Sequence, residues 1–390
     1  MVRDSLEHLK IAFFCWESLY AERVGGLANA ATNLAETLAR HHEVHFFTRG
    51  EGGDAEINGV RYHYCRPAGG ENIVRYCSDM SRGMIDRFAE FDTPSFDLLH
   101  FHDWHVVDVL RRLQERETIF TYHSTEFGRN GNRFSGGWPF SEISAIERYG
   151  ASIAKHITAV SSTLRREAMN LYDIPDWKID VVHNGIVPGH YQADVDPGAV
   201  KRHYGFDPDS PLILFVGRLA WQKGPDMLVD AAPHLLREHA DGQFAFIGDG
   251  QMRHGLETRA RSLPVRFLGR LADAEYVELL NASDIVAIPS RNEPFGLVLL
   301  EAWSAGRCVV ASDVGGLSEN IEHGTDGVKV RPHPDSIGEG LSRVVDSPEK
   351  ALSMGREGLE KVKKEFPWSR VAERMEESYR KLAKHDTIPC

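Results

Sequence analysis

Strand-like and helix-like segments alternate along almost the whole chain, and this alternation limits the possible folds more than any other feature. Short apolar runs lie at 11–16, 43–48, 98–101, 119–122, 157–160 and 179–182. Between several of them apolar residues recur at helical spacing, as they do over 27–40. Strands that alternate with helices predict a mostly parallel sheet with helices on both faces.

The same alternation restarts after a proline-rich stretch. Residues 186–210, which contain Pro188, Pro197 and Pro208, are therefore the expected linker. Strands are predicted beyond it at 212–216, 243–247, 265–268, 285–288 and 308–311, and helices at 226–238 and 297–305. The 390 residues also exceed the ~250–300 at which a single core stops growing. Two domains are therefore expected.

The predicted fold class is α/β, with two doubly wound, Rossmann-like domains facing each other across a cleft. The first domain is expected over 1–190 and the second over 191–367. The last helix, within 368–390, is expected to cross back to the first domain as a strap. Ligands of such sheets bind beyond the carboxyl ends of the strands, so the active site is expected between the two domains.

Composition excludes several other classes. The net charge of −12, from 45 Lys and Arg against 57 Asp and Glu, argues against nucleic acid as a partner. No apolar run reaches the ~18 residues of a membrane span, so no integral membrane segment is expected. The polar start of the chain and five scattered cysteines without a Cys-x-x-Cys motif are typical of a cytoplasmic protein.

The strongest motif is the segment 289–302, in which Glu293 and Glu301 are eight residues apart. It follows a predicted strand and leads into a helix that begins near Gly296. A helix N-terminus binds anions, and a glycine there lets a phosphate approach. One carboxylate is then available for sugar hydroxyls and the other for a ribose. The alternative is an ordinary helix with an acidic cap.

A second motif, Gly217-Arg218-Leu219 with Gln222-Lys223-Gly224, follows the first strand of the second domain. Arginine binds two phosphate oxygens at once and lysine acts as a compact charge, so the pair suits a diphosphate. A solvated basic loop is the alternative.

Histidines cluster after another strand, in the segment His100-Phe101-His102-Asp103-Trp104-His105. His102 is a candidate polar contact for a reacting sugar or a general acid or base. A metal site is disfavoured because no carboxylate or cysteine completes a ligand set. Asp194-Val195-Asp196, which resembles a metal-binding acid pair, lies in the linker and is expected to form a turn. No metal is expected.

The fourth motif is Arg23-Val24-Gly25-Gly26-Leu27, between a strand and a helix. Its glycines let the backbone approach a bound group. It is not the Gly-x-Gly-x-x-Gly pattern of dehydrogenases, and the chain has no Walker A sequence.

Together and in this order, the four motifs resemble the retaining glycosyltransferases of family 4, which have the GT-B fold. The subgroup they are most similar to is the glycogen and starch synthases, although Arg23 stands where those enzymes usually have lysine. The segments 102–105 and 121–129 also resemble that subgroup.

The resemblance implies roles for single residues. Catalytic roles fall to His102, Arg218, Lys223 and Glu293. Donor-binding roles fall to Arg23, Gly25, Gly26, Gly217, Phe267, Leu268, Gly269, Phe295, Gly296, Leu297 and Glu301. Arg218 and Lys223 would neutralise the leaving diphosphate, Glu293 would hold the sugar, and Glu301 would hold the ribose.

The resemblance implies a metal-independent hexosyltransferase that needs no cofactor and uses a nucleotide-sugar, UDP- or ADP-glucose, as its substrate. The acceptor is expected to be a carbohydrate: an α-glucan, a cell-surface polysaccharide or a small molecule. Two other classes stay open, a nucleotide-sugar epimerase and a non-catalytic carbohydrate-binding protein. The aromatic segment 127–140 either stacks on acceptor sugars or packs on its own domain. The oligomeric state is left open.

Overall fold

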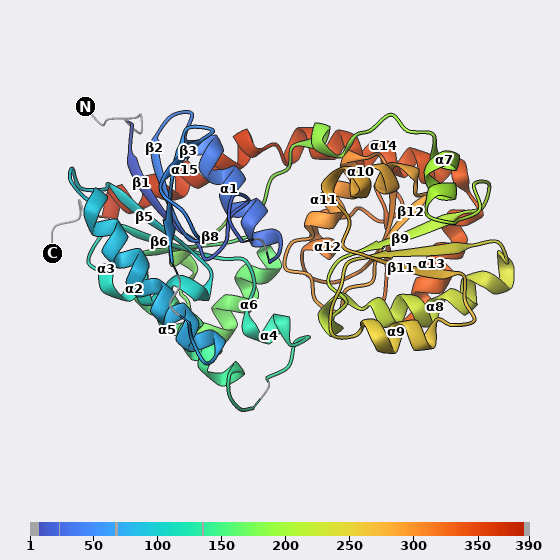
Figure 1. The fold of residues 1–390 in the computed structure, drawn as a ribbon, viewed down its shortest axis with the longest axis horizontal. Helices are drawn as coiled ribbons and strands as arrows, with labels where there is room; N and C mark the ends of the chain where they lie inside the picture. Colours follow the sequence, from blue (N-terminus) through green and yellow to red (C-terminus); the bar gives the residue numbers. More distant parts are fainter. Residues whose placement is uncertain (1–7, 23, 67–68, 135, 386–390) are drawn as a thin grey trace. The chain divides into compact units, whose positions relative to one another are not determined.

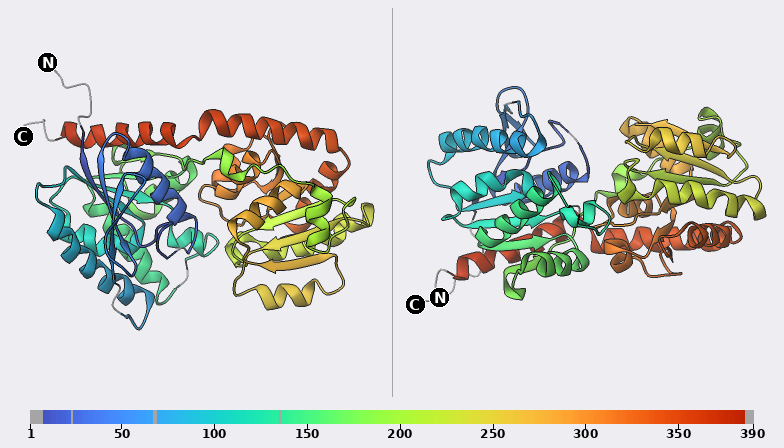
Figure 2. Two further views of the ribbon diagram at one scale, coloured as in Figure 1. Left: turned by 45° about the horizontal axis from the view of Figure 1, so that its top comes forward. Right: turned by 90° about the horizontal axis from the view of Figure 1, so that it is seen from below.

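The computed structural model describes residues 8–22, 24–66, 69–134 and 136–385, and the chain forms two compact units (Figure 1). Unit 1 comprises Met1–Phe127, Arg133–Gly185 and Trp368–Cys390. Unit 2 comprises Gly128–Asn132 and Ile186–Pro367. Each unit is an α/β layer structure with helices on both faces of its sheet (Figure 2).

Eight strands of unit 1 form one sheet over the described residues, in the order β3-β4-β2-β1-β5-β6-β7-β8. The strands are β1 (Lys10–Phe14), β2 (Glu43–Arg49), β3 (Ala55–Ile57), β4 (Val60–Cys65), β5 (Leu98–His102), β6 (Thr118–Tyr122), β7 (His156–Ala159) and β8 (Ile179–Val181). All neighbours pair in parallel except β3 and β4. That antiparallel pair is a hairpin which the sequence analysis did not predict.

Helices of unit 1 connect these strands and cover the sheet. They are α1 (Gly26–Leu38), α2 (Ile73–Phe91), η1 (Trp104–Val106), α3 (Val107–Leu113), α4 (Glu126–Arg129), α5 (Phe140–Ile153), α6 (Ser162–Tyr172), η2 (Asp176–Lys178) and α15 (Trp368–His385). The last helix packs on α1, and Trp368, Val371 and Met375 are buried in the same apolar core as Phe13 and Leu34. Unit 1 is therefore completed by the end of the chain.

Unit 2 carries a six-stranded parallel sheet over the described residues, in the order β11-β10-β9-β12-β13-β14. Its strands are β9 (Leu212–Val216), β10 (Gln243–Ile247), β11 (Val265–Gly269), β12 (Ile285–Ile288), β13 (Cys308–Ser312) and β14 (Val328–Val330). Its helices are η3 (Pro188–Tyr191), α7 (Pro197–His203), η4 (Trp221–Lys223), α8 (Pro225–Glu238), α9 (Arg253–Arg259), α10 (Asp273–Ala282), α11 (Leu297–Ser304), α12 (Gly315–Asn320), α13 (Pro334–Val345) and α14 (Pro348–Glu365).

The apolar runs that predicted the strands form the cores. Ile213, Phe215, Phe244 and Phe246 are all at most 2% exposed and pack in one cluster with residues of α8, α9 and α13. Strands covered on both faces read as continuous apolar runs, which is why their bounds were predictable. Helix bounds at α8 and α11 likewise agree with the prediction to within one residue.

The stretch predicted as a linker, residues 186–210, also has regular structure. They contain η3 and α7. Pro197 is at the first helical position of α7, where its missing N–H costs nothing. Asp196 caps the same helix by accepting hydrogen bonds from Gly198 N and Ala199 N. The Asp194-Val195-Asp196 segment thus ends in a helix cap.

Each sheet has a point at which successive strands are added on opposite sides. In unit 2 this point lies between β9 and β12, since β10 and β11 extend the sheet one way and β12 to β14 the other. In unit 1 it lies between β1 and β5. Ligands of doubly wound sheets bind beyond the carboxyl ends of the strands at such points.

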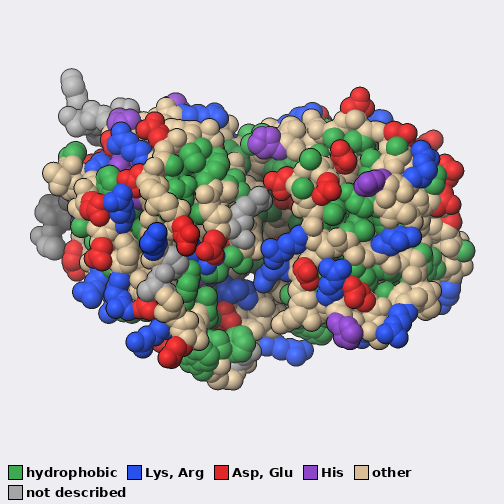
Figure 3. Space-filling model, in the orientation of Figure 1, with side chains coloured by type: hydrophobic (Ala, Val, Ile, Leu, Met, Phe, Trp, Pro, Cys, Tyr) green, Lys and Arg blue, Asp and Glu red, His purple; other side chains and the backbone are tan. Residues whose placement is uncertain are grey.

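None of the described helices has a stretch that is long and apolar enough to cross a membrane. Acidic and basic side chains are interspersed over each unit on the face shown in Figure 3. An anion site on this chain therefore depends on a few locally placed cations.

Candidate functional site

Two loops of unit 2 meet at its switch point. One, residues 217–224, follows β9, and the other, residues 289–296, follows β12. The two strands are neighbours, with Ile285 opposite Ile213 and Val286 opposite Leu214. The two strongest motifs of the sequence therefore share one edge of one sheet.

Lys223 and Glu293 connect these loops through an ion pair. The distance from Lys223 Nζ to Glu293 Oε2 is 2.7 Å, and the two side chains are 24% and 9% exposed. Ser290 Oγ donates to the same oxygen at 3.1 Å. The ammonium and the carboxylate are thus held in a fixed relation to each other at the switch point.

Arg218 is exposed on the same loop, where its Nη2 donates to Gln222 Oε1 at 3.3 Å. Gln222 is buried, and its backbone carbonyl accepts from Arg291 N at 2.8 Å. The guanidinium is therefore tethered to a residue that contacts the other loop. Arg218 keeps further donors for a ligand, because a guanidinium has five.

Gly296 precedes helix α11 in a left-handed conformation, with φ at 100°. The backbone angle favours glycine, and a Cβ at this position would lie 2.8 Å from Leu317 Cδ2, so the Leu317 side chain would have to shift. The helix begins at Leu297, no described side chain makes a capping hydrogen bond to it, and Phe295 beside it is buried. The first turn of α11 therefore has the geometry of an anion site, and it lies beside Glu293, the partner of Lys223.

Glu301 lies on the second turn of α11 and contacts two tyrosines. Tyr276 on α10 donates to Glu301 Oε2 at 2.6 Å, and Tyr191 in η3 donates to Oε1 at 3.4 Å. Burial, and next the charge of Glu301, raise the pKa of Tyr276 well above its usual value. Tyr276 therefore stays protonated and remains a donor to this carboxylate.

A second bridge between the two loops was not predicted from the sequence. Arg291 binds Asp226 with two hydrogen bonds, of 2.8 and 2.7 Å, and also donates to the Trp221 carbonyl at 2.9 Å. The guanidinium carbon lies 3.3 Å from the centre of the Trp221 ring. Sixty-five residues separate the two charges, so no local pattern could have joined them.

The three predicted donor-binding residues of β11 lie apart from the Lys223–Glu293 pair. Phe267, Leu268 and Gly269 are half-buried on the edge strand β11, and β10 lies between β11 and β9. Gly217, at the start of the Lys223 loop, donates to the carbonyl of Ile247 on β10. These candidate donor-binding residues therefore belong to the same sheet as the ion pair, two strands away from β9.

Glu17 holds the glycine turn of unit 1. Its Oε2 accepts hydrogen bonds from the backbone N–H groups of Val24 and Gly25, and Gly25 is the residue before helix α1, which starts at Gly26. Burial raises the pKa of Glu17, and these donors oppose that rise. Glu17 was not predicted, and Arg23 lies outside the described residues.

His102 ends β5, the strand beside β1, and is completely buried. Its Nδ1 is 3.0 Å from Nε2 of His123, and within the described ranges its Nε2 has no hydrogen-bond partner. Burial, and next the neighbouring His100 and His123, lower the pKa of His102 well below its usual value. The ring is therefore neutral at pH 7, and its Nε2 is buried.

His100, on the same strand, has structural partners. Its Nδ1 contacts the Tyr379 hydroxyl at 2.9 Å and its Nε2 contacts Thr121 Oγ1 at 2.7 Å. In the part of the chain that the structure describes, no three His, Cys, Asp or Glu residues are grouped so as to hold a metal ion.

Comparisons with known families and proteins agree with this arrangement. The model "Glycosyltransferase Family 4" matches residues 24–189, and "Glycosyl transferases group 1" matches residues 199–361. The chain is 36% identical to the glycosyltransferase MJ1607 of Methanocaldococcus jannaschii, over 86% of this chain and 89% of the relative.

Two further relatives differ in their named acceptors. A glycogen synthase of Mycobacterium tuberculosis is 30% identical over 71% of this chain and 66% of its own length. A D-inositol 3-phosphate glycosyltransferase of Thermobispora bispora is 28% identical over 80% of this chain and 77% of its own length.

Solved structures show the same fold over nearly the whole chain. Sucrose-phosphate synthase from Thermosynechococcus elongatus has a TM-score of 0.82 at 22% identity, covering 97% of this chain and 100% of that one. The catalytic domain of starch synthase IV from Arabidopsis thaliana, bound to ADP and acarbose, has a TM-score of 0.77 at 19% identity, with the same coverage of both chains. The fold, the two matched domains and the 36% identical relative lead to one conclusion: this chain belongs to glycosyltransferase family 4 and has the GT-B fold.

Proposed function

We propose that the chain transfers a hexose, glucose in the first instance, from a nucleoside diphosphate sugar to a carbohydrate acceptor and keeps the anomeric configuration. Unit 2 binds the donor at the edge formed by the Lys223 and Glu293 loops. The relatives named glycogen synthase and starch synthase support glucose as the sugar, and the ADP bound to the latter supports a nucleoside diphosphate as the leaving group.

The ion pair between Lys223 and Glu293 is the observation that carries the proposal. Within the described residues, both side-chain hydrogen bonds of Glu293 fall on Oε2, so Oε1 is available to accept a sugar hydroxyl. Lys223 has three N–H donors, of which Glu293 takes one. A carboxylate for the sugar and a cation for the phosphate are thus held 2.7 Å apart, as a bond between sugar and phosphate requires.

In the transfer step the bond between the anomeric carbon and the diphosphate oxygen breaks, and its electron pair stays on that oxygen. Lys223 and the exposed Arg218 stabilise the charge that develops there. The acceptor hydroxyl forms the new bond from the same face, and its proton passes to the departing phosphate. Retention follows from this route, and no side chain becomes covalently attached. A trapped sugar–enzyme adduct would contradict it.

We further propose that His102 contacts the donor sugar through Nε2 without acting as a proton donor. The ring is neutral near pH 7 because its pKa is lowered by burial. A neutral imidazole that binds a hydroxyl fits this environment better than an imidazolium does.

The test is release of nucleoside diphosphate by the purified chain in the presence of EDTA. The donors are UDP-glucose, ADP-glucose, UDP-N-acetylglucosamine and GDP-mannose, each with and without maltooligosaccharide. Release from a glucose donor that increases with glucan supports the proposal. If nucleoside diphosphate is released only from another donor, glucose is not the transferred sugar.

A second acceptor class has support from one comparison, since a relative is named for D-inositol 3-phosphate. The same assay with inositol 3-phosphate decides between a glycan and a small phosphorylated acceptor. Free sugar or epimerised nucleotide-sugar without acceptor would favour an epimerase. No release from any donor would favour a non-catalytic carbohydrate-binding protein.

A further inference from the structure

Unit 1 contains a cavity of about 230 Å³ that the donor site does not use. It lies between α2, α5 and the segment η1–α3, which directly follows the carboxyl end of β5. Its lining includes Ser78, Trp104, His105, Asp108, Glu142 and Tyr149. The lining therefore includes the segment that follows the His102 strand in the sequence.

Two residues of one cavity wall, Trp104 and His105, belong to a stack of flat groups. Trp104 and His105 have ring centres 4.3 Å apart, and His105 lies 4.0 Å from Trp16 with the ring planes 9° apart. The guanidinium carbon of Arg49 lies 4.1 Å from the centre of the Trp16 ring, and both residues are outside the described lining. The members come from the carboxyl ends of β1, β2 and β5, so the sheet itself fixes the wall. Flat, rigid walls of this kind suit a ring-shaped ligand.

The polar groups of the lining have a consistent chemistry. Asp108 and Glu142 supply carboxylates and Ser78 supplies a hydroxyl, while no lysine or arginine is among the described lining residues. Asp108 pairs with Arg111, one turn further along α3, at 3.2 Å. Carboxylates accept hydrogen bonds from hydroxyl groups and repel phosphate. The lining therefore favours a neutral ligand with several hydroxyls.

The size of the cavity narrows the choice further. It is smaller than the ~300–1,000 Å³ pockets that enclose drug-sized ligands. A single sugar ring fits this limit better than a stretch of polymer does.

From these observations we propose that the cavity binds the terminal, unphosphorylated sugar ring of the acceptor. The proposal rests on the proposed function, because it assigns the acceptor of that reaction. It favours a neutral glycan over a sugar phosphate or an inositol phosphate.

The test uses Ala145→Trp, which adds an indole at an exposed position in the cavity lining on α5. The matched control is Glu115→Gln, which removes an exposed carboxylate of the same unit outside the lining. Binding of maltose, maltotriose, glucose 6-phosphate and inositol 3-phosphate is followed by ligand-observed NMR. Nucleoside diphosphate release is measured with and without each compound.

We expect a neutral sugar to bind and to stimulate release, and the phosphorylated compounds to do neither. Ala145→Trp should weaken this binding and raise the acceptor KM by about tenfold or more, while release without acceptor stays within about twofold. Glu115→Gln should behave as the unsubstituted chain does.

Three results would overturn the proposal. They are unchanged neutral-sugar binding in Ala145→Trp, preferred binding of a phosphorylated compound, and lost binding without an effect on transfer. Failure of all four compounds to bind would also reject the proposal. Failure of the proposed function is recognised separately, as the absence of release from every donor in the unsubstituted chain.

Discussion

Asp226 and Arg291 form a bidentate ion pair that joins the first turn of α8 to the loop after β12. The side chains are 9% and 18% exposed, and the Arg291 guanidinium also lies on the Trp221 ring. Trp221 and Asp226, the two partners of Arg291, flank Gln222 and Lys223 in the sequence. The pair therefore fixes the loop that carries Lys223, for which we propose phosphate binding.

We expect Asp226→Asn to destabilise unit 2, because it leaves Arg291 half-buried without its charge partner. The expected loss is about 2 kcal/mol, less than the 3–5 kcal/mol of a fully buried pair. Urea unfolding measures it. Glu360→Gln is the control, since Glu360 pairs with Lys363 at an exposed site, where a loss below about 1 kcal/mol is expected. Equal losses in the two variants would refute the role of the Asp226–Arg291 pair.

Lys223→Ala and Arg218→Ala should each lower turnover by about 10²–10³-fold, because each removes a preorganised group that stabilises charge on the leaving phosphate. Steady-state release of nucleoside diphosphate measures the effect, and thermal unfolding verifies the fold. Arg259→Ala is a matched control, because Arg259 is 52% exposed on α9 and pairs only loosely with Asp230 at 3.4 Å. Turnover near that of the control in either site variant would remove it from the catalytic group.

Tyr276→Phe should raise the KM for the donor by about tenfold and leave kcat less affected. The change removes one hydroxyl that holds Glu301, and a hydrogen bond to a charged group is worth about 1.5–3 kcal/mol. Tyr204→Phe, on the neighbouring α7 segment, should leave KM unchanged. If Tyr276→Phe lowers kcat and leaves KM alone, Glu301 does not act through donor binding.

Much of the fold could be predicted because its signals are local. Residues 212–216, 243–247 and 285–288 are buried apolar runs, and the structure has strands at the same bounds. The β3–β4 hairpin also had a local signal, since Asn58 and Gly59 at its turn both have positive φ. That signal was overlooked, as was the cap at Asp196 that begins α7.

The site could be predicted only in part. Lys223 and Glu293 belong to motifs, and the pairing of β9 with β12 brings them together. Tyr276 and Asp226 act on residues 25 and 65 positions away, and neither stands in a pattern that indicates its partner. Such contacts depend on how helices pack on the sheet, which periodicity does not specify.

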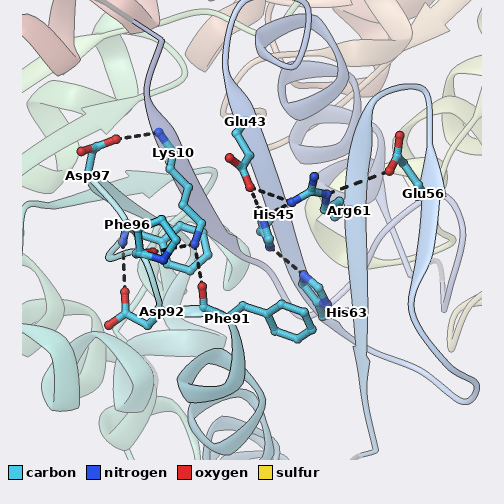
Figure 4. Close-up of polar contacts among 11 residues, drawn as sticks. Lys10, Glu43, His45, Glu56, Arg61, His63, Phe91, Asp92, Phe96 and Asp97 are labelled. Carbon is cyan, nitrogen blue, oxygen red and sulfur yellow. Dashed lines mark hydrogen bonds and ion pairs between the residues drawn. The ribbon is translucent and has the colours of Figure 1, made fainter.

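A row of polar side chains crosses β2 and β4 in unit 1, with the buried His45 and His63 between the more exposed Glu43 and Asp54. His45 lies between Glu43 and His63, at 3.0 Å from the carboxylate and 2.9 Å from the second ring (Figure 4). Asp54 accepts from the far nitrogen of His63 at 3.1 Å. Burial is the largest cause that lowers the pKa of His63, to about 4, and it also lowers the pKa of His45.

This row makes stability depend on pH. His63 takes up a proton near pH 6.5 when the chain is unfolded but only near pH 4 when it is folded, so its contribution is complete above about pH 6.5 and is lost as the pH falls towards 4. The loss amounts to about 3 kcal/mol for this group. Urea unfolding between pH 7.5 and 4.5 should therefore show falling stability, with a shallower slope in His63→Gln. His254→Gln, at an exposed position, should keep the original slope. If the slope of His63→Gln equals that of His254→Gln, the protonation of His63 does not govern the acid sensitivity.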